Sequence, residues 1–527
     1  MPISRIGRRT APRFIMPSSG SSRSSSGSKF HERRGRVSAP LDVFAFARLS
    51  GSANPRALNI VESIAARAEA GKTAVVADGR RLSFGELLGR AAEVAAWLEA
   101  SSGFQRAAVP RVGLACGNGL DYIALALGIL KAGGCLVPIA GELTDEERRE
   151  VIERTGLHGL LIGPDETWRA GECSPLREPG CGAGWIPLDE PPLDCEAEFA
   201  ALNPAFIRFS SGTTGRSKGV VLSHESLLER ITAANQVLQI GPDDRVLWML
   251  PMAHHFAVSI VLYLYFGACT VVGESHLAAD VLELAETESA TVIYGAPFHH
   301  ALLAADAGNF QWPQLRLPVS TAAGLPEATA RAFDARFGKP LVQGMGIIEV
   351  GLPLINADSA REAPGSVGKP VPGFEIELRE LTDGLGELWL RGPGMFDAYL
   401  SPWQPRAEIC VDGWFATGDL ARIDDAGRVT LCGRKKSVLN IGGMKVFPEE
   451  IEAVFDRHPA VKRSRAYGRD HAVLGTVVVA EIVLLEEVTA PALKTWCRQS
   501  LSAFKVPAVI QFVDELPLTA SGKIRRH

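Results

Sequence analysis

The sequence has no closely spaced cysteine pair and no excess of positive charge. Its nine cysteines are scattered without a C-x-x-C pair, which argues against a zinc site or a dithiol motif. An odd number of unclustered cysteines is typical of reduced thiols in the cytoplasm. The formal net charge of -5 gives no reason to expect a nucleic-acid partner. The 527 residues, 46% of them hydrophobic, instead predict a globular protein of about three or four domain-sized units.

Long uninterrupted hydrophobic runs are also missing. Residues 246–273 contain no Lys, Arg, Asp or Glu and are numerous enough to cross a bilayer. However, Pro251, the pair His254-His255 and Gly267 divide this stretch. We therefore predict a strand, a loop, a buried helix and a second strand here, and no transmembrane segment.

The N-terminus differs from the rest of the chain. The first 38 residues hold nine Lys or Arg and one acid, and residues 18–28 are nearly all Ser and Gly. Such a composition cannot bury a core, so we predict a disordered tail over residues 1–45. It is also typical of an organelle transit peptide, and a start at Met16 is a third alternative. An apolar region of the kind found in secretory signals is absent.

From residue 39 onward, helical and strand patterns alternate. The pattern predicts helices at 82–100, 122–131 and 144–155, and strands at 111–116, 135–139 and 159–162. This alternation indicates an α/β fold with largely parallel sheets. We expect a long connection over 164–202 and a β-rich subdomain from Ser366. A last unit follows Gly433, with helices at 448–456 and 490–502 and strands at 476–483 and 509–513.

One loop indicates phosphate binding. Residues 206–219 read FIRFSSGTTGRSKG, an apolar strand followed by glycines, hydroxyls and one lysine. Glycines let backbone N–H groups approach an anion, while the hydroxyls and Lys218 add donors and charge. The spacing differs from a Walker A loop. The following VVLSHESLLERI predicts a helix with Ser223 as its N-cap.

At this loop the chain resembles the adenylate-forming enzymes, which include acyl-CoA synthetases, adenylation domains and beetle luciferases. The resemblance extends in family order through LPMAHHF (250–256), VSTAAGLPE (319–327), GMGIIEVG (344–351), GWFATGDLARID (413–424), GRKKSVLNIGGMKVFPEEIE (433–452) and LPLTASGKIRR (516–526). It implies a large N-terminal domain over 46–433, with two mixed α/β sheets and a small β-barrel-like subdomain. A small, mobile α+β lid would follow over 434–527.

The resemblance also implies an activity. Such enzymes join a carboxylate to the α-phosphate of ATP, with Mg²⁺, and many pass the acyl group to CoA. Amino-acid-activating domains usually carry an Asp where Ala257 stands, so an amino acid is not the expected substrate. The run SIVLYLYF indicates a fatty or aromatic acid. Loading of a separate acyl carrier protein, and a degenerate nucleotide-binding relative without activity, remain open as alternatives.

Site residues follow from the matched motifs. The resemblance makes Lys523 the lysine that contacts the carboxylate and the α-phosphate, Glu349 and Thr214 the metal-holding residues, and His254 a gate beside the acyl pocket. Lys436 would be the hinge, with Gly442 and Gly443 along the CoA tunnel. The implied ATP-binding residues are Ser210, Ser211, Gly212, Thr213, Thr214, Gly215, Lys218, Ala323, Gly324, Gly344, Met345, Gly346, Asp419 and Arg434.

Five residues depart from the family pattern. Met345 replaces the usual Tyr that packs against adenine, and Ile348 replaces a Thr, which removes a hydroxyl expected near the α-phosphate. Thr321-Ala322 replace a Gly-Gly pair, and Ser437 stands where an acid is common. The lysines, acids and arginine that neutralise or position charge are retained.

Overall fold

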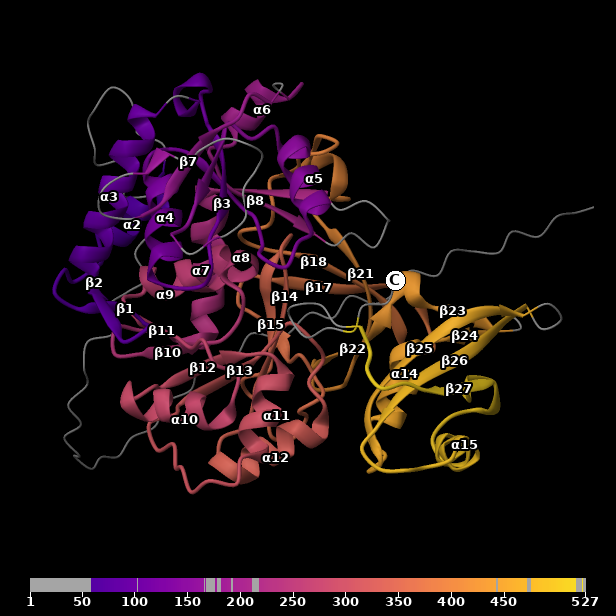
Figure 1. Cartoon of the computed structure of the whole chain (residues 1–527). Coiled ribbons are helices and arrows are strands. Elements are labelled where there is room, and N and C mark those ends of the chain that lie inside the picture. Colours follow the sequence, from indigo (N-terminus) through magenta and orange to yellow (C-terminus); the bar gives the residue numbers. More distant parts are fainter. Residues whose placement is uncertain are drawn as a thin grey trace, which may run out of the picture. The chain divides into compact units, whose positions relative to one another are not determined.

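The computed structural model in Figure 1 describes the chain from residue 58 to residue 517, with gaps, and Ile524. The described ranges are 58–101, 103–164, 166, 176–177, 182–190, 193–210, 218–441, 444–471 and 475–517. The predicted tail, residues 211–217 of the phosphate loop, Gly442, Gly443 and Lys523 lie outside them.

Two nine-stranded mixed sheets form the larger part of the fold. In the first, six central strands are parallel and antiparallel strands occupy both edges; its order is β16 (Lys369–Pro370), β15 (Gly351–Ile355), β14 (Val342–Ile347), β13 (Leu317–Ser320), β12 (Val292–Gly295), β10 (Arg245–Trp248), β11 (Cys269–Val272), β1 (Thr73–Ala77) and β2 (Arg80–Ser83). The parallel centre confirms the predicted α/β class.

The second sheet has four parallel strands at its centre. Its order is β20 (Gln404–Pro405), β19 (Ala398–Tyr399), β9 (Lys218–Ser223), β8 (Pro204–Ser210), β4 (Cys135–Pro138), β3 (Arg111–Ala115), β5 (Gly159–Ile162), β7 (Gly184–Pro187) and β6 (Leu176–Arg177). Strands β8 and β9 pair antiparallel with Ser210 opposite Lys218, so the predicted phosphate loop joins two neighbouring strands.

Two long helices of this part of the chain begin at a serine N-cap. Ser83 caps α3 (Phe84–Ala100) with Glu86 completing a capping box, and Ser223 accepts a hydrogen bond from the Ser226 backbone at the start of α7 (His224–Leu238). The other helices are α2 (Ile60–Ala65), α4 (Leu120–Lys131), α5 (Asp145–Thr155), α6 (Glu196–Ala201), α8 (Met252–His255), α9 (Val261–Tyr265), α10 (Ala278–Thr287), α11 (Pro297–Ala305), α12 (Glu327–Phe337) and α13 (Arg406–Ile409).

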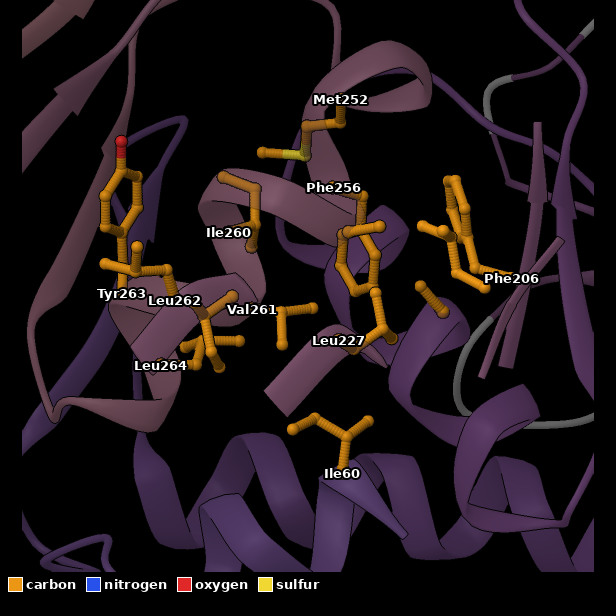
Figure 2. Close-up of a cluster of buried hydrophobic side chains, with 14 of the residues drawn as sticks. Ile60, Phe206, Leu227, Met252, Phe256, Ile260, Val261, Leu262, Tyr263 and Leu264 are labelled. Atoms are coloured by element: carbon orange, nitrogen blue, oxygen red, sulfur yellow. The ribbon is translucent and has the colours of Figure 1, made fainter. Parts of the chain in front are cut away.

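The uncharged stretch 246–273 lies inside the core, as predicted. It runs from β10 through α8, a π-helical turn (Phe256–Ile260) and α9 to β11. Figure 2 shows its side chains Phe256, Ile260 and Leu264 packed among residues such as Ile60 and Phe206. Among the described residues, we find no helix whose length and apolar character would let it span a membrane.

A four-stranded antiparallel sheet confirms the predicted β-rich subdomain. It consists of β17 (Glu375–Thr382), β18 (Leu385–Arg391), β21 (Phe415–Ile423) and β22 (Val429–Arg434). The chain then forms β23 (Leu439–Ile441) and β24 (Met444–Val446), α14 (Pro448–Phe455), β25 (Val461–His471), β26 (Gly475–Leu484), α15 (Ala490–Arg498) and β27 (Val509–Phe512). These last elements share a separate hydrophobic core that includes Ile451, Phe455, Ile482 and Leu493.

The expected long connection over 164–202 was wrong in part. This segment contains β6, β7 and α6, and β7 pairs antiparallel with β5 at the end of the sheet. Trp185 of β7 is fully buried, so tertiary packing forms a strand that four residues bounded by Gly and Pro do not predict. The predicted helix 490–502 ends earlier, at Arg498.

Candidate active site

Lys218 and Glu349 both contact the side chain of Tyr399. Lys218 begins β9, and Glu349 follows β14 in a short turn. The Lys218 Nζ atom lies 4.3 Å from the ring centre of Tyr399 on β19, and the Tyr399 hydroxyl donates a hydrogen bond of 3.3 Å to Glu349 Oε1. The structure therefore brings together two predicted residues through a third that the sequence did not indicate.

Tyr399 remains neutral in this position. The side chain is buried, and burial together with the Glu349 carboxylate raises the pKa of its phenol well above the ordinary value. A neutral phenol keeps its proton and acts as a donor. The ring offers its face to the Lys218 ammonium, which favours a cation–π contact.

Arg208 on β8 is a second residue that the predicted set lacks. Its Nη1 donates a 2.5 Å hydrogen bond to the backbone carbonyl of His254, and its buried Nε has no hydrogen-bond partner within the described part of the chain. Burial lowers the pKa of Arg208 to about 10, while the Glu349 and Glu142 carboxylates oppose this shift. The guanidinium thus stays charged at neutral pH. Its signal in the sequence was a lone arginine inside the apolar strand FIRFS.

His254 is held by its ring as well as by its backbone. The Glu142 carboxylate, from the loop after β4, contacts the His254 Nε2 atom. This contact is the main cause that lowers the pKa of the Glu142 carboxyl. A π-helical turn follows directly at Phe256–Ile260, a feature common at functional sites.

Asp419 and Arg434 form a separate pair on another sheet. They are register partners on β21 and β22, and Arg434 Nε lies 2.6 Å from Asp419 Oδ1. Asp419 is buried, its backbone N–H is capped by the Thr417 hydroxyl, and Arg434 Nη1 donates to the Thr417 carbonyl. A paired, oriented carboxylate of this kind suits recognition of two neighbouring hydroxyls.

The predicted adenine-pocket segments are joined to each other. The Thr321 hydroxyl donates to the Gly344 carbonyl at 3.1 Å, which ties the loop containing Ala323 and Gly324 to the Gly344–Gly346 stretch of β14. The preceding Ala322 has a φ of +71°, in the region that favours glycine. Met345 and Ile348 are both buried.

The remaining described sites lie elsewhere. Lys436 is exposed in the short 3₁₀ turn Lys435–Ser437, and the neighbouring Lys435 pairs with Glu380 and Glu387. Ser210 ends β8. Most of the described site residues therefore fall into three groups: around Tyr399, around Thr321, and the Asp419–Arg434 pair.

The chain matches known protein families along most of its length. A family described as AMP-binding enzyme matches residues 62–400, and one described as AMP-binding enzyme C-terminal domain matches residues 450–523. Both matches agree with the motifs from which the resemblance was inferred.

Curated relatives carry names of CoA ligases. A long-chain-fatty-acid–CoA ligase of Yersinia pestis is 32% identical over 340 residues, 61% of this chain and 60% of that one. An indoleacetate–CoA ligase of Aromatoleum aromaticum is 28% identical over 489 residues, 87% of this chain and 94% of the other. A sulfoacetate–CoA ligase of Cupriavidus necator is 31% identical over 78% of this chain and 85% of the other.

Among solved structures, ATP-bound MatB from Rhodopseudomonas palustris has the same fold. It superposes with a TM-score of 0.76 at 26% identity and covers 88% of this chain and 97% of its own. A large N-terminal domain and a small C-terminal domain, as the motifs implied, therefore describe this architecture.

Proposed function

The chain belongs to the family of AMP-binding enzymes and, like its curated relatives, is an acid–thiol ligase; from this we propose that it activates a carboxylic acid with ATP and transfers the acyl group to CoA. In the first step, a carboxylate oxygen attacks the α-phosphorus of ATP and the bond to pyrophosphate breaks. In the second step, the CoA sulfur attacks the acyl carbonyl carbon, AMP leaves with the former carboxylate oxygen, and the thiol proton is released.

The observation that carries this proposal is the cluster around Tyr399. Lys218 and Glu349 approach the same phenol, and the Arg208 guanidinium interacts electrostatically with Glu349 while holding the His254 carbonyl. Bringing two anions together requires fixed positive charge in a site that excludes water. The cluster supplies two cations, one carboxylate and a neutral donor.

Magnesium fits this donor set. Mg²⁺ needs only one or two protein carboxylates beside phosphate oxygens and water, and Glu349 provides one carboxylate in this cluster. Glu349 would hold it, and Thr214 would add its hydroxyl. When bound, Mg²⁺ would neutralise phosphate charge. We propose Asp419 for the ribose, Arg434 for a contact with the nucleotide, and Lys523 for the α-phosphate and the carboxylate.

We further propose that residues 434–527 act as a lid that turns about Lys436. The separate core of the elements from β24 onward supports an independent unit, because a domain needs its own buried apolar cluster. Such a rotation would let one site complete two steps in turn. Gly442 and Gly443 would then line the passage for CoA.

The acid is proposed to be hydrophobic, either fatty or aromatic. Ala257 offers no carboxylate to an amino-acid ammonium, and two relatives are named for a long-chain fatty acid and indoleacetate. The apolar run 259–266 packs in the core, which accounts for its composition without a substrate. The name of the sulfoacetate ligase makes a polar acid the second candidate.

CoA is proposed as the acceptor, and a carrier protein is the alternative. A thioester assay with CoA and with a phosphopantetheinyl carrier protein separates them, since only the correct thiol should discharge the acyl-adenylate. We also propose a cytoplasmic location, in keeping with the buried free thiols of Cys135, Cys195, Cys269 and Cys497.

A further inference from the structure

Arg230 is a fully buried arginine in α7, near the Tyr399 cluster. Only 2% of its surface is exposed. Nε and Nη2 both donate to the Gly394 carbonyl oxygen, at 2.9 and 2.6 Å, and Nη1 donates to the Ile348 carbonyl oxygen at 3.0 Å. These three bonds use the guanidinium as a fork between two backbone segments.

A charged group in this position is not what packing alone would favour. Taking a guanidinium out of water is costly, and an apolar side chain of similar volume often serves stability as well or better. The nearby Asp397 and Glu349 carboxylates partly offset that cost. Packing alone therefore does not explain why a charged guanidinium, with hydrogen bonds to two backbone segments, occupies this position.

Both segments that Arg230 holds also contact Glu349. Ile348 directly precedes Glu349 in the chain. The segment that begins at Gly394 returns to Glu349 twice: the Phe396 N–H donates to the Glu349 carbonyl at 2.7 Å, and the Tyr399 hydroxyl donates to its carboxylate. Arg230 thus connects the Ile348 segment to the Gly394–Tyr399 segment, and these two segments hold Glu349.

The fit between these segments leaves little freedom. Gly394 has a φ of +65°, and a Cβ atom there would lie 2.4 Å from the Arg230 backbone nitrogen. The Gly394 N–H in turn donates to Glu229 Oε2, so α7 holds this residue from two successive side chains. A displacement of Arg230 would accordingly move both Ile348 and the segment that begins at Gly394.

We propose that Arg230 is a positioning residue, which fixes the Glu349 carboxylate where Mg²⁺–ATP binds. The proposal rests on the proposed function, in which Glu349 holds the metal. Groups that orient a metal ligand typically change metal affinity by about 10–100-fold when they are replaced. The guanidinium need not touch the ion or the substrate.

The test compares ATP binding with Mg²⁺ and with EDTA, measured by titration calorimetry on the full chain without any acid. The dissociation constant with EDTA divided by the dissociation constant with Mg²⁺ reports how strongly the metal aids ATP binding. Arg230→Met removes charge and fork, while Arg230→Lys keeps the charge alone. We expect the ratio to fall about tenfold or more in both variants. Arg111 on β3 provides the matched control, because it is fully buried, donates to the Gly156 carbonyl and pairs with Glu196 of α6 rather than with Glu349.

Arg111→Lys should keep the wild-type ratio even where its melting temperature falls. Glu349→Gln should lower the ratio, and adding Arg230→Lys to it should lower the ratio no further, since both changes act through one carboxylate. A wild-type ratio in the Arg230 variants, an equal loss in Arg111→Lys, additive losses in the double variant, or a wild-type protein indifferent to Mg²⁺ would each overturn the proposal. If Arg230→Met does not fold, Arg230→Lys and the double variant decide. Failure of the proposed function would appear separately, as absence of acid-dependent activity in the wild-type protein.

Discussion

The Glu142 carboxylate lies against the Nε2 atom of His254, although 112 residues separate them in the chain. Arg208 of β8 donates to the His254 carbonyl, so the residue proposed as a gate is held at its ring and at its backbone. The Glu142–His254 contact connects the loop after β4 to α8, the helix that directly precedes the π-helical turn.

The Glu142–His254 contact predicts a pH dependence of stability. The contact holds the pKa of Glu142 below its ordinary value of about 4.5. A carboxyl whose pKa is lowered by folding contributes stability that is present above the ordinary pKa and is lost as pH falls through the lowered value. Glu142→Gln should therefore flatten this acid limb in melting temperatures measured from pH 6 to pH 3. Because Glu142 is exposed, the effect should be small; a limb unchanged from wild type would contradict the account.

Removal of the Tyr399 hydroxyl should slow adenylation. Tyr399→Phe keeps the ring beneath Lys218 and removes the donor to Glu349. A hydrogen bond to a charged group contributes about 1.5–3 kcal/mol, so adenylation should slow by about tenfold or more. Tyr467 is a matched control, since its hydroxyl donates to Glu481 in the C-terminal sheet at 3.2 Å. Equal losses of adenylation rate in Tyr399→Phe and Tyr467→Phe would show that the hydrogen bond from Tyr399 to Glu349 has no specific effect on adenylation.

Replacing Ala322 with glycine should stabilise the protein. Its φ of +71° is unfavourable for a residue with a Cβ atom, and Ala322→Gly should raise the free energy of unfolding by about 0.5–1 kcal/mol. The adjacent Ala323→Gly has no positive φ to relieve and should not stabilise the protein. Chemical denaturation measures both, and a less stable Ala322→Gly would refute the strain.

Replacing Lys523 should affect the two half-reactions differently. Lys523→Ala should abolish formation of the acyl-adenylate, because the cation that joins carboxylate and α-phosphate is lost. Thioester formation from supplied acyl-AMP and CoA should be retained. Rapid-quench assays of each step decide this, and an equal loss in both would mean that Lys523 does not have the assigned role.

Features encoded locally could be predicted from the sequence. The Ser83–Glu86 capping box and the Ser223 cap depend on residues three positions apart, and both helices begin where those residues stand. The buried stretch around Phe256 was also predicted, because charges are absent and helix breakers divide it.

Residues brought in by distant parts of the chain could not be predicted. Tyr399 contacts Glu349 from 50 positions away in the sequence, and Glu142 contacts His254 of α8 from 112 positions away. Neither residue stands in a recognised motif. Trp185 was missed for the same reason, since its strand lies between β5 and β6 and pairs with both.

The central claim is that this chain forms acyl-adenylates, and acid-dependent exchange of labelled pyrophosphate into ATP tests it most directly. The assay should cover long-chain fatty acids, aryl acids such as indoleacetate, and polar acids such as sulfoacetate. The account predicts exchange above background with at least one fatty or aryl acid, lost in Glu349→Gln. Absence of exchange with every acid, from a folded protein that binds ATP, would contradict it.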